Sequence, residues 1–259
     1  MSRVDVLGVS IDAISMRDAL ETIEGFIARD ERRAVVFPNA FCVTEARRDH
    51  RFRAALNAAE LVLPDGTPVV WASRLLGRPD AERVCGPDVF EELNALAADR
   101  GYTVYFLGGA IADNAARVAR AVQARHATLK VVGTCSPPAG PIDGALEEEI
   151  LAGIADARPD ILWVGLGSPM QETWIFRNRS LIEAKVTLAV GGTFNYYNGT
   201  RRRAPHWMRN NGLEWLHRIR LDVSLVWKKR FYALPYRFFV PLGVRAFQER
   251  LNRPSEGRE

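Results

Sequence analysis

The sequence predicts an α/β fold built around a parallel sheet. Short apolar runs alternate with longer segments of helical periodicity through residues 1–199, and strands that alternate with helices typically form parallel sheets. Glycines or polar residues follow several of the apolar runs, as they do where a sheet ends in a ligand site. The length of 259 residues, with 47% hydrophobic and 25% charged residues, suits a globular protein with a substantial core.

The individual elements follow from periodicity and from capping residues. Ser15, with Asp18 three residues later, is a suitable N-cap for the first helix, because its hydroxyl can accept a backbone N–H there. Pro87 suits the first turn of its helix, where a missing N–H costs no hydrogen bond. The predicted strands are Val4–Val9, Ala34–Phe37, Leu61–Leu63, Thr103–Leu107, Leu129–Val132, Ile161–Val164 and Val186–Val190. The predicted helices are Met16–Arg29, Thr67–Leu76, Pro87–Arg100, Asp113–Arg125, Asp143–Ala157 and Gln171–Asn178.

Composition excludes several classes of protein. No apolar run approaches the roughly 20 residues of a membrane-spanning helix, and the N-terminus lacks the apolar segment of a signal peptide, so we expect a cytoplasmic protein. Cys42, Cys85 and Cys135 are too few and too scattered for a disulfide framework or a zinc site. The four histidines show no metal or triad spacing, and no cofactor is expected.

The basic charge is concentrated at the C-terminal end. Residues 201–259 hold 14 lysines and arginines against five acids, whereas residues 1–200 hold 21 against 26. Such a block suits anionic lipid, a pyrophosphate or nucleic acid, or is simply a solvated helical face. Leu216, Ile219 and Val223 recur at amphipathic helix spacing among basic and aromatic residues, which suits a lipid headgroup layer. Packing against the body of the protein or a partner subunit is the alternative.

Polar or glycine-rich residues follow the strands at the edge where α/β sheets bind ligands. Glycine there lets the backbone approach a phosphate. The segments are Pro38-Asn39, Pro64–Thr67, Gly108-Gly109, Gly165–Glu172 and Gly191–Asn195, the last of which carries the polar candidates Thr193 and Asn195.

Asp65 is the best candidate for a reacting carboxylate. It lies between a proline and a glycine at a strand end, where a carboxylate can reach the proton of a bound hydroxyl. An Asx-turn or an N-cap of the helix at 67–76 explains the same residue equally well.

The other candidates carry weaker signals. Arg83 can contact a phosphate or hold Asp65 in place, whereas Asp88 is more typical of a helix start. Gly108-Gly109 is an incomplete dinucleotide fingerprint, and Gln171-Glu172 can bind sugar hydroxyls or cap a helix. The chain has no Asp-x-Asp motif, so an enzyme that acts on a nucleotide sugar would neutralise its leaving diphosphate with arginines or helix N-termini.

Six motifs in order resemble the WecG/TagA/CpsF family of bacterial glycosyltransferases. They are PNA (Pro38–Ala40), LPDGTPVVWASRLLG (Leu63–Gly77), RVCGPD (Arg83–Asp88), YFLGG (Tyr105–Gly109), GLGSPMQE (Gly165–Glu172) and GGTFNYYNGTRRRAPHWMRNNGLEWLHR (Gly191–Arg218). Three positions depart from the usual pattern, because Phe37 stands where threonine is common, Asn195 where aspartate is common and Leu225 where arginine is common.

The resemblance implies an inverting, metal-independent transfer of a hexose or N-acetylhexosamine from a UDP-sugar. The acceptor is a polyprenyl-diphosphate-linked sugar at the inner face of the cytoplasmic membrane, in cell-surface or exopolysaccharide synthesis. The implied fold is a Rossmann-like core of two tightly joined subdomains, residues 1–199, with a helical appendage, residues 200–259, that associates with the membrane and helps close the site.

The resemblance also assigns roles to individual residues. Asp65 matches the general base, and Gly108 and Gly109 match the nucleotide side of the site. The sugar and phosphate pocket is matched by Asn39, Arg83 and Gln171, and pyrophosphate contacts are matched by Arg218 and Arg230.

Other functions remain open from the sequence. A nicotinamide-dependent dehydrogenase would use the Gly108-Gly109 turn, but it lacks the third glycine and the acidic residue about 20 positions later. A non-catalytic scaffold at the membrane would use only the basic tail. Nucleic-acid binding has no recognised module behind it, so no nucleic-acid partner is expected. Either a monomer or a homo-oligomer is compatible with the pattern.

Overall fold

The computed structural model describes residues 3–109, 111–205, 207–208, 236–246 and 248. Its strands are β1 (Arg3–Val6), β2 (Val9–Asp12), β3 (Arg33–Val36), β4 (Leu61–Val62), β5 (Thr103–Gly108), β6 (Lys130–Cys135), β7 (Ile161–Gly165) and β8 (Val186–Ala189). Its helices are α1 (Met16–Ala28), α2 (Ala40–Ala46), α3 (His50–Asn57), α4 (Thr67–Leu75), α5 (Gly86–Arg100), α6 (Asn114–Gln123), α7 (Gly144–Ala157), α8 (Met170–Asn178) and α9 (Phe194–Tyr197), with a 3-10 turn at Gly191–Thr193. A further helical segment spans residues 236–246.

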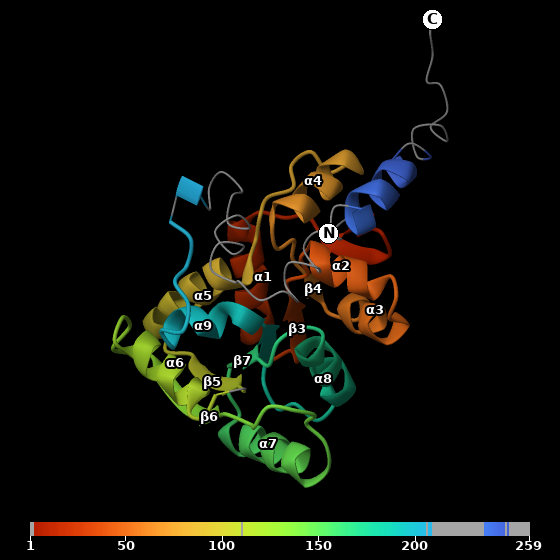
Figure 1. Ribbon diagram of the computed structural model, residues 1–259. Coiled ribbons are helices and arrows are strands. Elements are labelled where there is room, and N and C mark those ends of the chain that lie inside the picture. Colours follow the sequence, from red (N-terminus) through yellow and green to blue (C-terminus); the bar gives the residue numbers. More distant parts are fainter. Residues whose placement is uncertain (1–2, 110, 206, 209–235, 247, 249–259) are drawn as a thin grey trace, which may run out of the picture.

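Six parallel strands form one sheet in the order β4-β3-β8-β7-β5-β6. Helices cover both of its faces (Figure 1). This confirms the predicted α/β class, and the two halves of the predicted core meet in a single continuous sheet. The outermost strand β6 alternates between exposed and half-buried residues, as suits an edge, whereas β8 is buried throughout.

Each face of the sheet has its own apolar core, because successive strand side chains point to opposite faces. Phe106 and Trp163 belong to the cluster that holds the apolar residues of α1, α5 and α6. Their neighbours Leu107 and Val164 belong to the cluster formed with α2, α3, α4, α7 and α8. The near-continuous apolar strands of the sequence are therefore those of a sheet covered on both sides.

The N-terminal strand prediction was wrong in one respect. The run Val4–Val9 is an antiparallel hairpin of β1 and β2 rather than a single strand. Leu7 and Gly8 both have positive φ, the conformation of a type I′ turn, and the Gly8 N–H donates to Asp5 Oδ1 at 2.7 Å. The turn signal is a lone glycine, which a continuous apolar run conceals.

Two short helices between β3 and β4, α2 and α3, were not predicted. Each begins at a capping side chain: Asn39 accepts from the Cys42 N–H, and Asp49 accepts from the N–H groups of Arg51 and Phe52. Capping oxygens of this kind satisfy backbone donors that a helix start leaves open. Both helices are too short for a clear periodic pattern, so their caps were the available signal.

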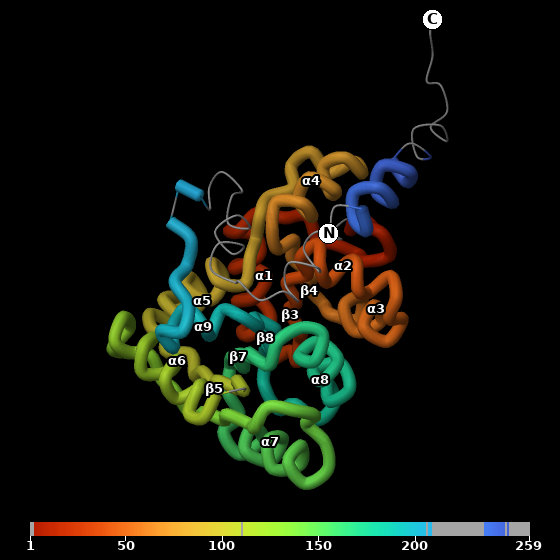
Figure 2. The backbone as a smooth tube through the Cα atoms, in the orientation of Figure 1, coloured from red at the N-terminus to blue at the C-terminus, as the bar shows by residue number. Residues whose placement is uncertain are grey.

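The connections reverse direction between β5 and β7. The helix after β5, α6, packs on one face of the sheet, and the helix after β7, α8, packs on the other. In open parallel sheets, ligands bind at the carboxyl ends of strands whose connections diverge in this way. The tube drawing shows α6 and α8 lying apart on either side of the sheet (Figure 2).

Candidate active site

Backbone hydrogen bonds join the loop that follows β4 to the loop that follows β3 and to the segment before α5. The Asp65 N–H donates to the Pro38 carbonyl at 3.2 Å, and the Val84 N–H donates to the Pro64 carbonyl at 3.2 Å. A Cβ at Gly86, where α5 begins, would lie in ordinary contact with Thr193 Oγ1, at 3.5 Å, so the start of α5 lies beside the segment that follows β8. Residues far apart in sequence therefore meet at one edge of the sheet, as their strand-end positions predicted.

Asp65 is half-buried and lies three residues after the end of β4 at Val62. It does not cap α4, because the N-cap of that helix is Gly66, at φ 94°, without a side-chain capping bond. The negative charge of Asp65 contributes to raising the pKa of two buried thiols, Cys42 and Cys85. Asp65 thus lies close to both the β3 loop and the start of α5, which removes the N-cap explanation of this residue.

Asn39 has a structural role in this structure. Its Oδ1 accepts the Cys42 N–H at 3.1 Å and caps α2. Burial, followed by the charge of Glu172, raises the pKa of Cys42 to about 12, and its Sγ lies 3.4 Å from Ser168 Oγ. Asn39 therefore fixes the start of α2, from which Cys42 contacts the β7 loop, and its predicted contact with substrate remains a prediction.

Gln171 lies at the start of α8 with its amide fully engaged in the loop. Its Oε1 accepts the Gly167 N–H at 3.1 Å, and its Nε2 donates to Glu172 Oε1 at 2.9 Å. The neighbouring Glu172 is only 3% exposed, and burial raises its pKa. Its Oε2 is buried without a hydrogen-bond partner. A protonated carboxyl suits this position, because an ionised one would be desolvated there.

The glycines that end β5 and β7 make room for an aromatic ring. Gly108 and Gly165 are register partners, and a Cβ on either would lie 2.4 Å or 2.7 Å from ring atoms of Phe194. At Gly109 a Cβ would lie 3.0 Å from the Pro137 carbonyl oxygen. The absence of a side chain at Gly108 thus allows the Phe194 ring to pack against the ends of β5 and β7. The nucleotide contacts predicted for Gly108 and Gly109 remain predictions.

Thr193 and Asn195 flank Phe194 in the segment after β8. Thr193 is buried and its hydroxyl donates to the Val190 carbonyl at 2.8 Å. Asn195 is half-buried, and its backbone carbonyl accepts the Arg201 N–H at 2.9 Å. Phe37, in place of the family's common threonine, is buried in the apolar core 3.7 Å from where a Cβ of Gly86 would lie. Position 37 therefore supplies no hydroxyl to the site.

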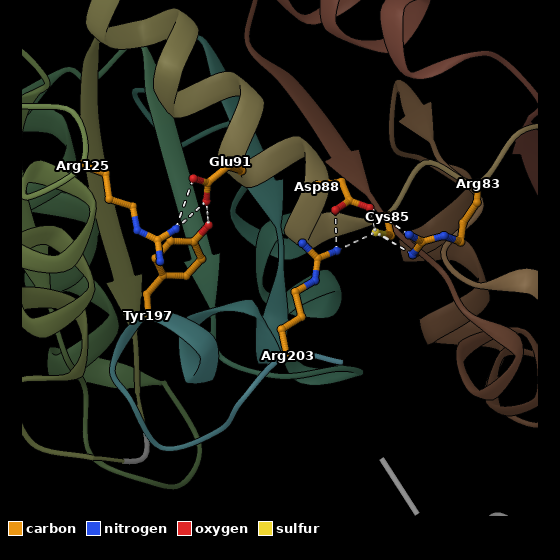
Figure 3. A network of polar contacts seen from close by, with 7 residues as sticks. All are labelled: Arg83, Cys85, Asp88, Glu91, Arg125, Tyr197 and Arg203. Atoms are coloured by element: carbon orange, nitrogen blue, oxygen red, sulfur yellow. Dashed lines mark hydrogen bonds and ion pairs between the residues drawn. The ribbon is translucent and has the colours of Figure 1, made fainter. Parts of the chain in front are cut away.

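Arg83 joins a compact polar network at the start of α5 (Figure 3). Its guanidinium donates to Asp88 Oδ2 at 2.9 Å and to Cys85 Sγ at 2.9 Å. Arg203, from the segment after α9, donates to the other oxygen, Asp88 Oδ1. Burial opposes ionisation of Asp88, but the Cys85 hydrogen bond and the Arg203 charge outweigh it and lower its pKa.

Sequence reasoning missed the importance of two of these residues. Asp88 was interpreted as a helix-start residue, and it does lie in the first turn of α5, but it also joins two arginines. Arg203 was not distinguished from Arg201 and Arg202, because three adjacent arginines give no indication of which one turns inward. Arg218 and Arg230 lie outside the described residues. Among the helices that the structure describes, none is long and apolar enough to cross a membrane.

Comparison with known proteins agrees with this geometry. The model of the WecG/TagA/CpsF glycosyl transferase family matches residues 4–254, and the chain belongs to this family. It is therefore a glycosyltransferase. Two proteins of Staphylococcus aureus, from strains MRSA252 and NCTC 8325, are each 31% identical to it over 239 residues, which is 90% of either chain. Both are named N-acetylglucosaminyldiphosphoundecaprenol N-acetyl-beta-D-mannosaminyltransferase.

Proposed function

We propose that this protein transfers a hexose or N-acetylhexosamine from a UDP-sugar to a polyprenyl-diphosphate-linked sugar, with inversion and without a metal ion. The observation that carries the proposal is the position of Asp65 beside the loops of β3 and α5 at the carboxyl edge of the sheet. The names of the 31% identical relatives support an acceptor with a diphosphoundecaprenol carrier and make UDP-N-acetylmannosamine the first donor to test.

The proposed chemistry is a single displacement. Asp65 accepts the proton of an acceptor hydroxyl while that oxygen attacks the anomeric carbon on the face opposite UDP. The bond from the anomeric carbon to the diphosphate breaks, and its electron pair leaves with UDP. One displacement converts an α-linked donor into a β-linked product, which agrees with the β-mannosaminyl transfer in the relatives' names.

Arginines supply the positive charge that the leaving diphosphate needs. Arg83 lies in the network next to Asp65, and the proposed contacts of Arg218 and Arg230 lie outside the described residues. Preorganised cations aimed at a developing charge are a large part of transition-state stabilisation. Asn39, Gln171, Thr193 and Asn195, which the resemblance or their strand-end position assigns to the substrate, complete the proposed site.

A membrane surface is the proposed location of the reaction, on the cytoplasmic side. The helix at residues 236–246 packs Phe238 and Leu242 into the core and leaves Val240 and Val244 exposed on its other side. Trp71 and Leu75 are exposed on α4, which begins two residues after Asp65. Figure 1 shows α4 and the 236–246 helix at the same end of the molecule. Apolar side chains with arginines nearby suit a headgroup layer.

Residues 200–259 are thus proposed to act as an appendage that binds the membrane and closes the site over the core at 1–199. Phe238 and Leu242 are buried in the core, so residues 236–246 of this segment pack on it. Substitutions of its exposed face are therefore a cleaner test of membrane binding than truncation, because truncation would uncover apolar core surface.

The test is product formation from a panel of UDP-sugars with a prenyl-diphosphate-linked N-acetylglucosamine acceptor. We expect turnover of one donor, unaffected by a metal chelator, and inverted configuration at the transferred sugar. Retained configuration would contradict the single displacement. Binding of UDP without turnover of any donor would favour the scaffold alternative.

A further inference from the structure

Asp88 joins two arginines that come from distant parts of the chain. Each carboxylate oxygen accepts from one guanidinium, Oδ2 from Arg83 at 2.9 Å and Oδ1 from Arg203. The Cys85 thiol also donates to Oδ2, at 2.8 Å. Figure 3 shows Arg83 approaching from the loop before α5 and Arg203 from the segment after α9, with Asp88 between them. The three charged side chains are 21–25% exposed, so they are ordered at the surface of the site rather than sealed inside it.

The charges of this network favour an anion. Burial and the charges of Asp65 and Asp88 raise the pKa of Cys85 well above its usual range, so the thiol stays neutral and donates. Within the network, two guanidinium groups and one carboxylate leave a net positive charge, and Asp65 adds a negative charge beside it. The network also lies at the N-terminus of α5, a helix of 15 residues, whose dipole adds further positive potential.

We propose that Asp88 is a positioning residue that holds Arg83 and Arg203 side by side as a two-guanidinium site for the diphosphate of the donor, which makes Arg203 a further substrate-binding residue. The inference rests on the proposed UDP-sugar function and names a part of its site. Paired guanidinium groups suit a diphosphate because each one presents a planar fork of N–H donors to phosphate oxygens. Holding both in place before binding removes part of the ordering cost.

A purely neutralising role for Asp88 predicts the opposite behaviour. If Asp88 only offset positive charge, Asp88→Asn would make the site more positive and UDP would bind more tightly. If Asp88 positions the arginines, the same variant keeps one acceptor oxygen, so at least one guanidinium loses its partner and UDP binds more weakly. The sign of the change in UDP affinity therefore separates the two roles.

The experiment is calorimetric titration of the full-length chain with UDP and with UMP. We expect Asp88→Asn and Arg203→Ala each to weaken UDP binding by roughly tenfold or more, with a smaller effect on UMP. Arg203→Lys keeps the charge without the planar fork, so it should restore part of the lost affinity. Arg203→Ala alone carries the test if Asp88→Asn does not fold.

Glu91→Gln is the matched control. Glu91 lies one turn further along α5 and accepts from Arg125 at 2.9 Å and from the Tyr197 hydroxyl, in a second arginine–carboxylate network away from Asp88 (Figure 3). This variant should bind UDP as the wild type does. Equal or tighter UDP binding in both Asp88→Asn and Arg203→Ala overturns this inference and leaves the proposed function standing. A wild type that binds no UDP overturns the proposed donor, and this inference with it.

Discussion

Substitution of Gly108 by alanine tests how the Phe194 ring packs against the ends of β5 and β7. The new Cβ would lie 2.4 Å from Cδ2 and Cε2 of Phe194, whereas ordinary contact begins at 3.4 Å. The ring must therefore retreat by about 1 Å, yet it is 1% exposed and its centroid lies 6.0 Å from that of Phe90 and 6.1 Å from that of Phe106. Overpacking of this kind costs about 1–3 kcal/mol.

A double-mutant cycle attributes that cost to the ring. Phe194→Ala alone should lower the free energy of unfolding by about 3–5 kcal/mol, but it also removes the atoms that Gly108→Ala meets. Gly108→Ala should then cost less than about 0.5 kcal/mol in the Phe194→Ala background, which gives a coupling energy of roughly 1–3 kcal/mol. The assay is equilibrium urea unfolding of the four proteins, followed by tryptophan fluorescence.

The matched control is Gly192→Ala. A Cβ at Gly192 would meet Asn195 Nδ2 at 3.9 Å, so this change should leave stability within about 0.5 kcal/mol of the wild type. An equal cost for Gly108→Ala with and without the Phe194 ring would refute the packing argument. Unchanged stability together with weaker UDP binding would instead assign Gly108 to the nucleotide, as the sequence predicts.

Three further predictions concern the β3 loop, the buried acid and the membrane surface. Asn39→Ala should lower the free energy of unfolding by about 0.5–2 kcal/mol, because α2 loses its cap; thermal unfolding should show that Asn39→Asp, which keeps a capping oxygen, loses less. Burial raises the pKa of Glu172 above its ordinary 4.5, so the folded state retains a proton that the unfolded state releases, and this contribution to stability is lost as pH rises above that value. The melting temperature of Glu172→Gln should therefore rise relative to that of the wild type as the pH increases above 4.5, and a difference that stays constant with pH would contradict the protonated carboxyl. Trp71→Glu should reduce the fraction of protein that sediments with anionic phospholipid vesicles. The control is Leu181→Glu, which should not reduce it, because Leu181 is equally exposed at 56% but lies between α8 and β8. Equal losses in the two variants would contradict a membrane face at α4.

The sequence predicts most of the sheet because its strands are buried on both faces. Continuous apolar runs such as Ile161–Val164 have few alternatives to a central parallel strand, and the structure confirms it as β7. Elements whose signal depends on one or two residues were not predicted from the sequence. The hairpin turn at Leu7-Gly8 and the cap at Asn39 are local features whose signals are weak beside an apolar run.

The candidate site divides in the same way. The strand-end position of Asp65 follows from its place after an apolar run, and the structure brings it beside the β3 loop and α5. The network of Asp88 and Arg203 joins residues 115 positions apart, and no local pattern reports such a pairing. Gly108-Gly109 is a local pattern that was recognised but is ambiguous. A glycine pair indicates that other atoms approach the backbone closely, without indicating whether they belong to a ligand or to the Phe194 ring.

The most direct test of the account compares wild type and Asp65→Asn in two measurements, sugar transfer from the productive UDP-sugar and equilibrium binding of UDP. If Asp65 is the general base, the amide cannot accept the acceptor proton, so transfer should fall by about 10²–10⁴-fold while the Kd for UDP changes by less than about threefold. Transfer within about tenfold of the wild type would contradict the assignment of Asp65 as the base. A parallel loss of UDP binding and transfer would instead give Asp65 a structural role at the strand-end loops.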